Sequence, residues 1–260
     1  MEQSSEFGAS ELGTKQYWDN RYATELENYK DHKDIGEVWF GEDIAEKVVD
    51  WVEDLGTSFK NKPLIDIGCG NAHLLFMLSD LGYTCLVGTD YSKLAIDLAT
   101  NISENTENSK NIKFIQANIL EPNSSAKMCD ELSNMKSNDT KCMKYSIILD
   151  KGTFDAICLK PVDESNKDEI SKLSKKITED QDKNNTTTDF TARNSYIDFI
   201  RNIIEPSEGI FLITSCNWTE DELKNHFGTH FLPVGRINHR SFTFGGIKGQ
   251  TVSSVAFKLK

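Results

Sequence analysis

The sequence has few of the features that mark membrane-spanning, secreted or zinc-binding chains. None of its apolar runs approaches the roughly 18 residues of a membrane-spanning helix, and its polar, acidic first residues contain no apolar signal segment. The six cysteines are scattered without a C-x-x-C pair, and the five histidines show no metal-ligand spacing. These absences predict a cytoplasmic protein with reduced thiols, no membrane contact and no metal site.

Positive charge is scarce as well. The chain has 29 Lys and Arg against 41 Asp and Glu, which gives a net charge of −12 and a pI near 4.9. Such a surface repels nucleic-acid phosphate, so we expect no direct nucleic-acid partner. It attracts basic proteins, although the same charge also serves solubility, and the charge alone leaves both roles open.

Short apolar runs alternate regularly with helical patterns along the chain. Its 260 residues suffice for one sizeable core. Right-handed crossovers between the runs place the strands in one mostly parallel sheet with helices on both faces. With a C-terminal antiparallel hairpin made of residues 242–244 and 252–257, we expect an α/β, Rossmann-like sheet of seven strands. The five runs before the hairpin are residues 64–67, 85–89, 112–117, 145–149 and 209–214.

We expect a single domain over residues 11–260, in a monomeric protein. Residues 1–10 are predicted to be a disordered tail, and residues 11–60, which contain many aromatic side chains, are predicted to form an N-terminal lid. Two polar stretches, at about 121–144 and 163–194, are predicted to be insertions.

The first apolar run leads into the pattern D-x-G-x-G-x-A, which begins at Asp66. Gly68 and Gly70 allow backbone angles that other residues avoid, so a ligand can approach the main chain at the start of the next helix. A dinucleotide site has a third glycine where this chain has His73, and Asp66 would repel a pyrophosphate. An acid at this position favours a ligand with a positively charged amino group. An ordinary strand-to-helix turn is the alternative.

A second acid closes the next apolar run. Asp90 lies 20 residues after Gly70 (90 − 70), the usual position of an acid that accepts hydrogen bonds from both ribose hydroxyls. Together, the glycine pattern and Asp90 resemble the first motifs of the seven-strand S-adenosylmethionine-dependent methyltransferases.

Several further stretches resemble one branch of these enzymes, the eukaryotic protein-lysine methyltransferases that modify translation elongation factor 1-alpha. The resemblance covers most of the chain except residues 1–10, 121–144 and 163–194. The most specific blocks are D-K-G-T-F-D-A at 150–156 and T-S-C-N-W at 214–218, accompanied by G-T-K-Q-Y-W-D at 13–19, G-E-V-W-F-G at 36–41, D-Y-S at 90–92 and F-x-F-G-G at 242–246.

The resemblance implies a cytoplasmic enzyme that uses S-adenosylmethionine and acts on a protein substrate, elongation factor 1-alpha. Related enzymes often have aspartate beside the adenine, where this chain has Asn118, whose carbonyl still accepts a hydrogen bond from an exocyclic amine. The lid aromatics, Trp18 among them, either contact the ligand or only pack the lid onto the sheet. The predicted cofactor-binding residues are Trp18, Asp66, Gly68, Gly70, Asp90, Tyr91 and Asn118.

Methyl transfer from a sulfonium to an amine is an in-line displacement, to which orientation contributes roughly 7–11 kcal/mol. The sulfonium and partial desolvation lower the pKa of the incoming lysine, so a dedicated base is unnecessary. Asp150, at the end of a central strand, is predicted to orient the amine, with a helix-capping carboxylate as the alternative. Phe154 and Trp218 are predicted to flank the lysine stem, with core packing as the alternative.

Two other functions remain open on this evidence. One is a small-molecule N- or O-methyltransferase of the same fold, and the other is a non-catalytic module that binds the cofactor or has lost it. The intact acids and glycines at Asp66, Gly68 and Asp90 argue against the module. A nicotinamide oxidoreductase is disfavoured by Asp66 and His73.

Overall fold

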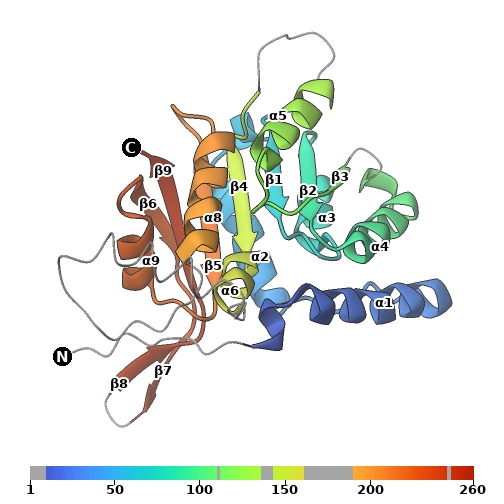
Figure 1. The fold of residues 1–260 in the computed structure, drawn as a ribbon, viewed down its shortest axis with the longest axis horizontal. Coiled ribbons are helices and arrows are strands. Elements are labelled where there is room, and N and C mark those ends of the chain that lie inside the picture. Colours follow the sequence, from blue (N-terminus) through green and yellow to red (C-terminus); the bar gives the residue numbers. More distant parts are fainter. Residues whose placement is uncertain (1–9, 110–111, 136–142, 161–189, 245–246) are drawn as a thin grey trace, which may run out of the picture.

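The computed structural model has a seven-stranded sheet at its centre (Figure 1), with the strand order β3-β2-β1-β4-β5-β9-β6. Strand β9 runs antiparallel to both of its neighbours, and the other described pairings in this sheet are parallel. This confirms the predicted fold class. The strands are β1 (Leu64–Ile67), β2 (Leu86–Asp90), β3 (Lys113–Gln116), β4 (Ile147–Lys151), β5 (Ile210–Ser215), β6 (Phe231–Ile237) and β9 (Ser253–Leu259). The structure describes residues 10–109, 112–135, 143–160, 190–244 and 247–260.

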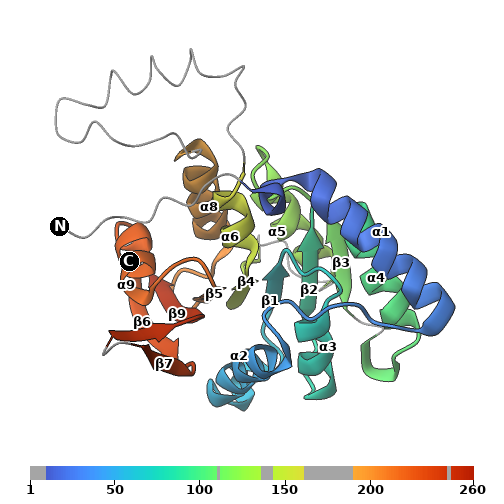
Figure 2. The same ribbon diagram turned by 90° about the horizontal axis from the view of Figure 1, so that it is seen from below.

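Helices cover both faces of the sheet (Figure 2). On one face, α5, α6, α8 and α9 enclose a core that includes Phe154 and Phe211. On the other face, α2 and α3 bury side chains such as Val48 and Leu75, and α1 packs against α4 through Tyr22. No helix within the described ranges is long and apolar enough to cross a membrane. The helices are α1 (Lys15–His32), α2 (Glu42–Asp54), α3 (His73–Asp80), α4 (Lys93–Glu104), α5 (Ser124–Met135), α6 (Thr153–Cys158), α8 (Phe190–Ile203) and α9 (Glu220–Phe227).

The N-terminal segment crosses the edge of the sheet at which the parallel strands end (Figure 1). A short 3-10 helix, η1 (Glu11–Gly13), leads into α1, and a loop then connects α1 to α2. The predicted lid over residues 11–60 therefore divides into two parts. Helix η1, α1 and the loop lie over the carboxyl edge, whereas α2 belongs to the layer that covers one sheet face.

The C-terminal pairing differs from the sequence prediction. Strand β9 pairs with β5 and β6, whereas residues 242–244 belong to β7 (Ser241–Phe244), which pairs with β8 (Ile247–Gln250) in a separate small sheet. The predicted pairing of 242–244 with 252–257 was wrong. Strand β6, for which no strand was predicted, contains Pro233 and Gly235, and the register shifts between them. An edge strand tolerates such residues because one of its sides needs no ladder partner.

The two segments predicted as polar insertions also contain ordered structure. Helix α5 lies within 121–144 and buries Met128, Cys129 and Leu132 in the core, so its apolar stripe is stronger than its Ser- and Asn-rich composition indicated. Residues 190–194 form the first part of α8. The predictions for residues 1–9 and 163–189 lie outside the described residues.

Candidate functional site

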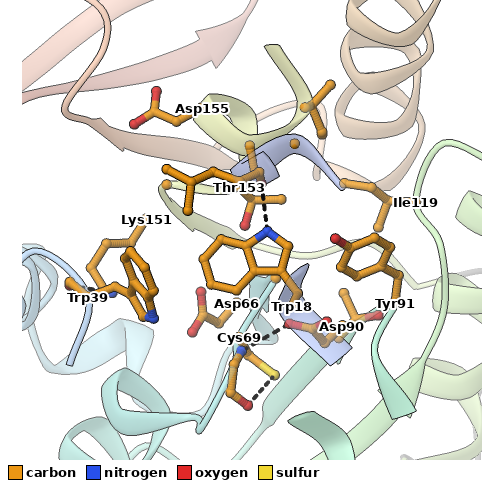
Figure 3. A pocket seen from close by; sticks show the side chains of 18 of the residues that line it. Trp18, Trp39, Asp66, Cys69, Asp90, Tyr91, Ile119, Lys151, Thr153 and Asp155 are labelled. Atoms are coloured by element: carbon orange, nitrogen blue, oxygen red, sulfur yellow. Dashed lines mark hydrogen bonds between the residues drawn. The ribbon is translucent and has the colours of Figure 1, made fainter. Parts of the chain in front are cut away.

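A cavity of about 350 Å³ lies at the carboxyl edge of the sheet, under the N-terminal segment (Figure 3). Its wall is built by α1, the loop after it, and the turns that follow β1, β2, β3, β4 and β5. The seven residues predicted to bind a cofactor all line it: Trp18, Asp66, Gly68, Gly70, Asp90, Tyr91 and Asn118.

The turn after β1 brings bare backbone to the cavity. Gly68 and Gly70 have φ values of 65° and 55°, in the left-handed region that favours glycine. A Cβ on Gly68 would lie 1.9 Å from Oγ1 of Thr153, and a Cβ on Gly70 would lie 2.5 Å from the hydroxyl of Tyr22. Both glycines are therefore required by contact with distant segments as well as by backbone angle.

Asp90 organises the turn from the next strand. Its carboxylate accepts hydrogen bonds from the backbone N–H of Gly70 at 3.1 Å and of Ser92 at 2.8 Å. Burial raises the pKa of Asp90 to about 6, and these two donors oppose that rise. Each carboxylate oxygen has two lone pairs, so acceptor capacity remains for a ligand in the cavity.

Asp66 is a buried carboxylate without a hydrogen-bond donor among the described residues. It lines the cavity, and burial raises its pKa to about 7, whereas the positive charge of Lys151 lowers the pKa. A buried carboxylate that no donor satisfies is unfavourable unless something else supplies positive charge or hydrogen bonds. The donor chemistry therefore fits a ligand that presents an ammonium group.

The lid aromatics both pack together and face the cavity. Trp18 donates from Nε1 to the carbonyl of Leu12 at 2.7 Å, and its ring lies 4.8 Å from that of Trp39 and 6.0 Å from that of Tyr22. All three rings line the cavity, and Figure 3 shows Asp66, Asp90 and Tyr91 around the Trp18 indole. The two alternatives for Trp18, ligand contact and packing, are thus compatible.

Three predicted site residues are not among the described residues that line the cavity. Asp150 accepts hydrogen bonds from the N–H groups of Thr153 at 2.9 Å and Phe154 at 3.0 Å, and from the hydroxyl of Tyr196 at 2.5 Å. This is the geometry of a helix-capping carboxylate, the alternative that the sequence left open. Phe154 is fully buried, and its ring packs 5.5 Å from that of Trp218.

The same motifs supply wall residues that sequence reasoning did not single out. Asp155 lines the cavity, and its carboxylate accepts hydrogen bonds from Oγ of Ser215 at 2.5 Å and from the N–H of Cys216 at 2.8 Å. Burial raises the pKa of Asp155. The position of these residues in the blocks 150–156 and 214–218 marked the blocks as part of the site. It did not indicate which side chains face the cavity. The other wall residues from these blocks are Lys151, Gly152, Thr153, Ala156, Cys216 and Asn217.

Fold and cavity together define a Rossmann-like methyltransferase. A family model described as a methyltransferase domain matches residues 58–237. Among solved structures, an S-adenosylmethionine-dependent methyltransferase from Anabaena variabilis has the same fold, with a TM-score of 0.58, 14% identity and full coverage of both chains.

Curated relatives show to which family of methyltransferases the chain belongs. EEF1A lysine methyltransferase 2 of Danio rerio is 36% identical over 98% of this chain and 91% of its own length. Protein-lysine N-methyltransferase efm4 of Schizosaccharomyces pombe is 37% identical over 96% of this chain and 94% of its own length. The chain belongs to this family of protein-lysine methyltransferases.

Proposed function

We propose that this chain uses S-adenosylmethionine to methylate a lysine side chain of elongation factor 1-alpha. The cofactor assignment is carried by the carboxylate of Asp66, which is buried in the cavity wall without a hydrogen-bond donor among the described residues. The substrate assignment is supported by two relatives: the Danio rerio protein is an EEF1A lysine methyltransferase, and the Schizosaccharomyces pombe protein is a protein-lysine N-methyltransferase.

The residues present fit this cofactor. Asp66 would receive the ammonium of its amino-acid part, and the free lone pairs of Asp90 would receive the ribose hydroxyls. Tyr91 and Ile119 offer an apolar wall for a flat base. Oδ1 of Asn118 accepts a hydrogen bond from the N–H of Leu120 at 3.1 Å. Its second lone pair would accept a hydrogen bond from the amine of the adenine. When bound, the cofactor supplies a methyl group on positively charged sulfur.

The chain's own task is to hold a lysine amine in line with that methyl group. A free lysine has a pKa near 10.4, and desolvation together with a nearby positive charge lowers this value, so no dedicated base is required. We assign the orienting contact to Asp155 instead of Asp150, since Asp155 lies in the cavity wall. A carboxylate there accepts a hydrogen bond from the amine and stabilises the positive charge that develops on nitrogen.

The proposal includes a monomeric enzyme in the cytoplasm, where its protein substrate would be found. The cytoplasmic location is supported by the described cysteines, which form no disulfide with one another. A small-molecule methyltransferase is not favoured by a specific feature of the cavity, so it serves as an alternative outcome of the test.

The decisive experiment is mass spectrometry of purified elongation factor 1-alpha after incubation with the enzyme and isotopically labelled S-adenosylmethionine. We expect labelled methyl groups on a lysine residue. As a control, the Asp66→Asn variant should transfer far less label, since the proposed ammonium contact loses its charge. If the parent enzyme adds no methyl group to the factor but labels a small molecule in an extract, the substrate assignment is wrong.

A further inference from the structure

The cavity wall contains a cation to which the proposed function gives no role. Lys151 ends β4 and lines the cavity beside Asp66, where a positively charged cofactor is proposed to bind. An isolated ammonium at this place would repel that cofactor. Lys151 therefore needs a negatively charged partner or a separate structural role, and the structure shows both.

The charged groups that face Lys151 are acidic. They are Asp66 on the neighbouring strand β1, Asp150 on its own strand, and Glu42 at the start of α2. Asp66 itself faces Lys151 and Asp90. Burial raises the pKa of Asp66, and of the two charges only Lys151 opposes the rise. With a pKa of about 7, Asp66 is only partly ionised near neutral pH, and it would be ionised less without Lys151.

Lys151 also fastens the segment that roofs the cavity. We call residues 35–41, which lead from α1 to α2, the strap. From one side, Nδ2 of Asn71 donates to the carbonyls of Ile35 at 3.0 Å and Glu37 at 3.2 Å. From the other side, Nζ of Lys151 donates to the carbonyl of Trp39 at 2.9 Å.

The strap needs such fastening because its backbone is strained next to this contact. Phe40 has a φ of 71°, which is rare for a bulky residue. Its ring lies 5.6 Å from Nζ of Lys151 and also packs on Gly152, where a Cβ would come within 3.1 Å of the ring. Strained conformations persist only where the surroundings hold them. Lys151 thus affects both the ionisation of Asp66 and the position of Trp39 and Phe40, which line the cavity.

We infer that Lys151 is a positioning residue, which favours the ionised form of Asp66 for the cofactor's ammonium and holds the Trp39–Phe40 part of the strap over the cavity. The inference rests on the proposed function for its ligand, whereas the strap contact concerns the cofactor-free protein. It assigns Lys151 no bond-making step. Lys151→Met and Lys151→Gln remove the charge, Lys151→Arg retains it, and Asn71→Ala loosens the strap without removing a charge.

The first measurement is the dissociation constant of S-adenosylmethionine between pH 6 and 9, by calorimetry. In the parent, binding should strengthen as pH rises through the pKa of Asp66, because only the carboxylate attracts the ammonium. In Lys151→Met and Lys151→Gln this rise should move to higher pH. Starting from a pKa of about 7 for Asp66, an increase of one unit would weaken binding at pH 7 by about fivefold. Lys151→Arg should restore the parent's pH profile, and Asn71→Ala should weaken binding without shifting that profile.

The second measurement is amide hydrogen exchange of residues 35–41 in the cofactor-free protein. Exchange should accelerate in Lys151→Met, Lys151→Gln and Asn71→Ala, but not in Lys151→Arg. Parent-like exchange and an unshifted pH profile in a folded, charge-free variant would overturn the inference and leave the proposed function intact. If the parent itself does not bind S-adenosylmethionine, the proposed function fails, and the charge part of the inference fails with it.

Discussion

The two halves of the cavity are built from different kinds of contact. The half proposed to bind the cofactor (the cofactor half), at the ends of β1 and β2, consists of glycine backbone and of the carboxylates Asp66 and Asp90, of which Asp90 accepts hydrogen bonds from the N–H groups of Gly70 and Ser92. The other half, at the ends of β4 and β5 with the strap, is where the lysine that accepts the methyl group would bind, and we call it the acceptor half. It depends on hydrogen bonds between residues far apart in sequence. Lys151 reaches Trp39, 112 residues away, and Asp155 reaches Cys216, 61 residues away.

This difference explains why a local pattern locates one half and not the other. In the cofactor half, residue type and spacing locate the glycine turn and the two acids, although Thr153 and Tyr22 also approach Gly68 and Gly70 closely. In the acceptor half, Asp150 and Asp155 stand in one short block, and only packing decides which faces the cavity. Asp150 is turned away by its hydrogen bond to Tyr196, whereas Asp155 is held at the wall by Ser215.

The largest expected effect is at Gly68, where the halves touch. Gly68→Ala places a methyl group 1.9 Å from Oγ1 of Thr153, whose hydroxyl donates to the carbonyl of Ile67. Cofactor binding, measured by calorimetry, should weaken by more than roughly 100-fold, because the turn must move. Gly82→Ala is the matched control, since it has a φ of 89° but nothing within 4 Å of a new Cβ. Parent-like binding by Gly68→Ala would show that the turn is not part of the site.

The acceptor half is tested by exchanging its two acids for amides. Asp155→Asn should lower kcat by about 10²–10³, with little change in cofactor affinity, because it removes an oriented charge that matters most in the transition state. Asp150→Asn should instead lose about 1–3 kcal/mol of unfolding free energy, since an amide cannot accept all of the hydrogen bonds at this position.

Turnover assays and denaturant titrations of both variants separate these roles. The reverse result, a large kcat loss in Asp150→Asn and none in Asp155→Asn, would return the orienting role to Asp150.

Within the cofactor half, Asp90→Ala should weaken S-adenosylmethionine binding by about 2–4 kcal/mol, as two hydrogen bonds to a charged acceptor are lost and water replaces them in part. Asp90→Asn, which retains one acceptor oxygen, should show a smaller loss in the same calorimetric titration. An unchanged affinity in both variants would mean that the ribose site lies elsewhere.

The smallest effect concerns stability against pH. The pKa of Asp66 is raised by burial from 3.8 to about 7, so the folded state holds a proton that the unfolded chain releases. Stability from this group is complete below pH 4 and is lost as pH rises towards 7, by about 2 kcal/mol between pH 5 and 7. In denaturant titrations, Asp66→Asn should have a shallower slope than the cofactor-free parent by this amount, while Asp90 and Asp150, whose pKa values burial raises to about 6 and about 8, still contribute to the slope of both proteins. A parent and variant with identical slopes would place the titration on other groups.

The contrast between local and long-range contacts also explains which parts of the molecule could be predicted from the sequence. The strand ends at Asp66 and Asp90 follow from apolar runs and spacing, and the parallel order follows from the alternation of strands and helices. Strand β6 was missed because Pro233 and Gly235 obscure its pattern, and its partner β9 was therefore paired wrongly. The sequence did not predict which side chains of the acceptor half face the cavity, because this depends on the buried hydroxyl of Tyr196 and on the strap.

The arrangement of the roof also has a consequence for biosynthesis. The strap and α1 leave the ribosome well before β4, yet their contact to the sheet, between Trp39 and Lys151, spans 112 residues. Such non-local contacts form slowly, because a long loop must close first. The nascent N-terminal segment must therefore wait, with Trp18 and Trp39 uncovered, until the central strands assemble. Apolar surface exposed in this interval makes the new chain prone to aggregation until the sheet forms.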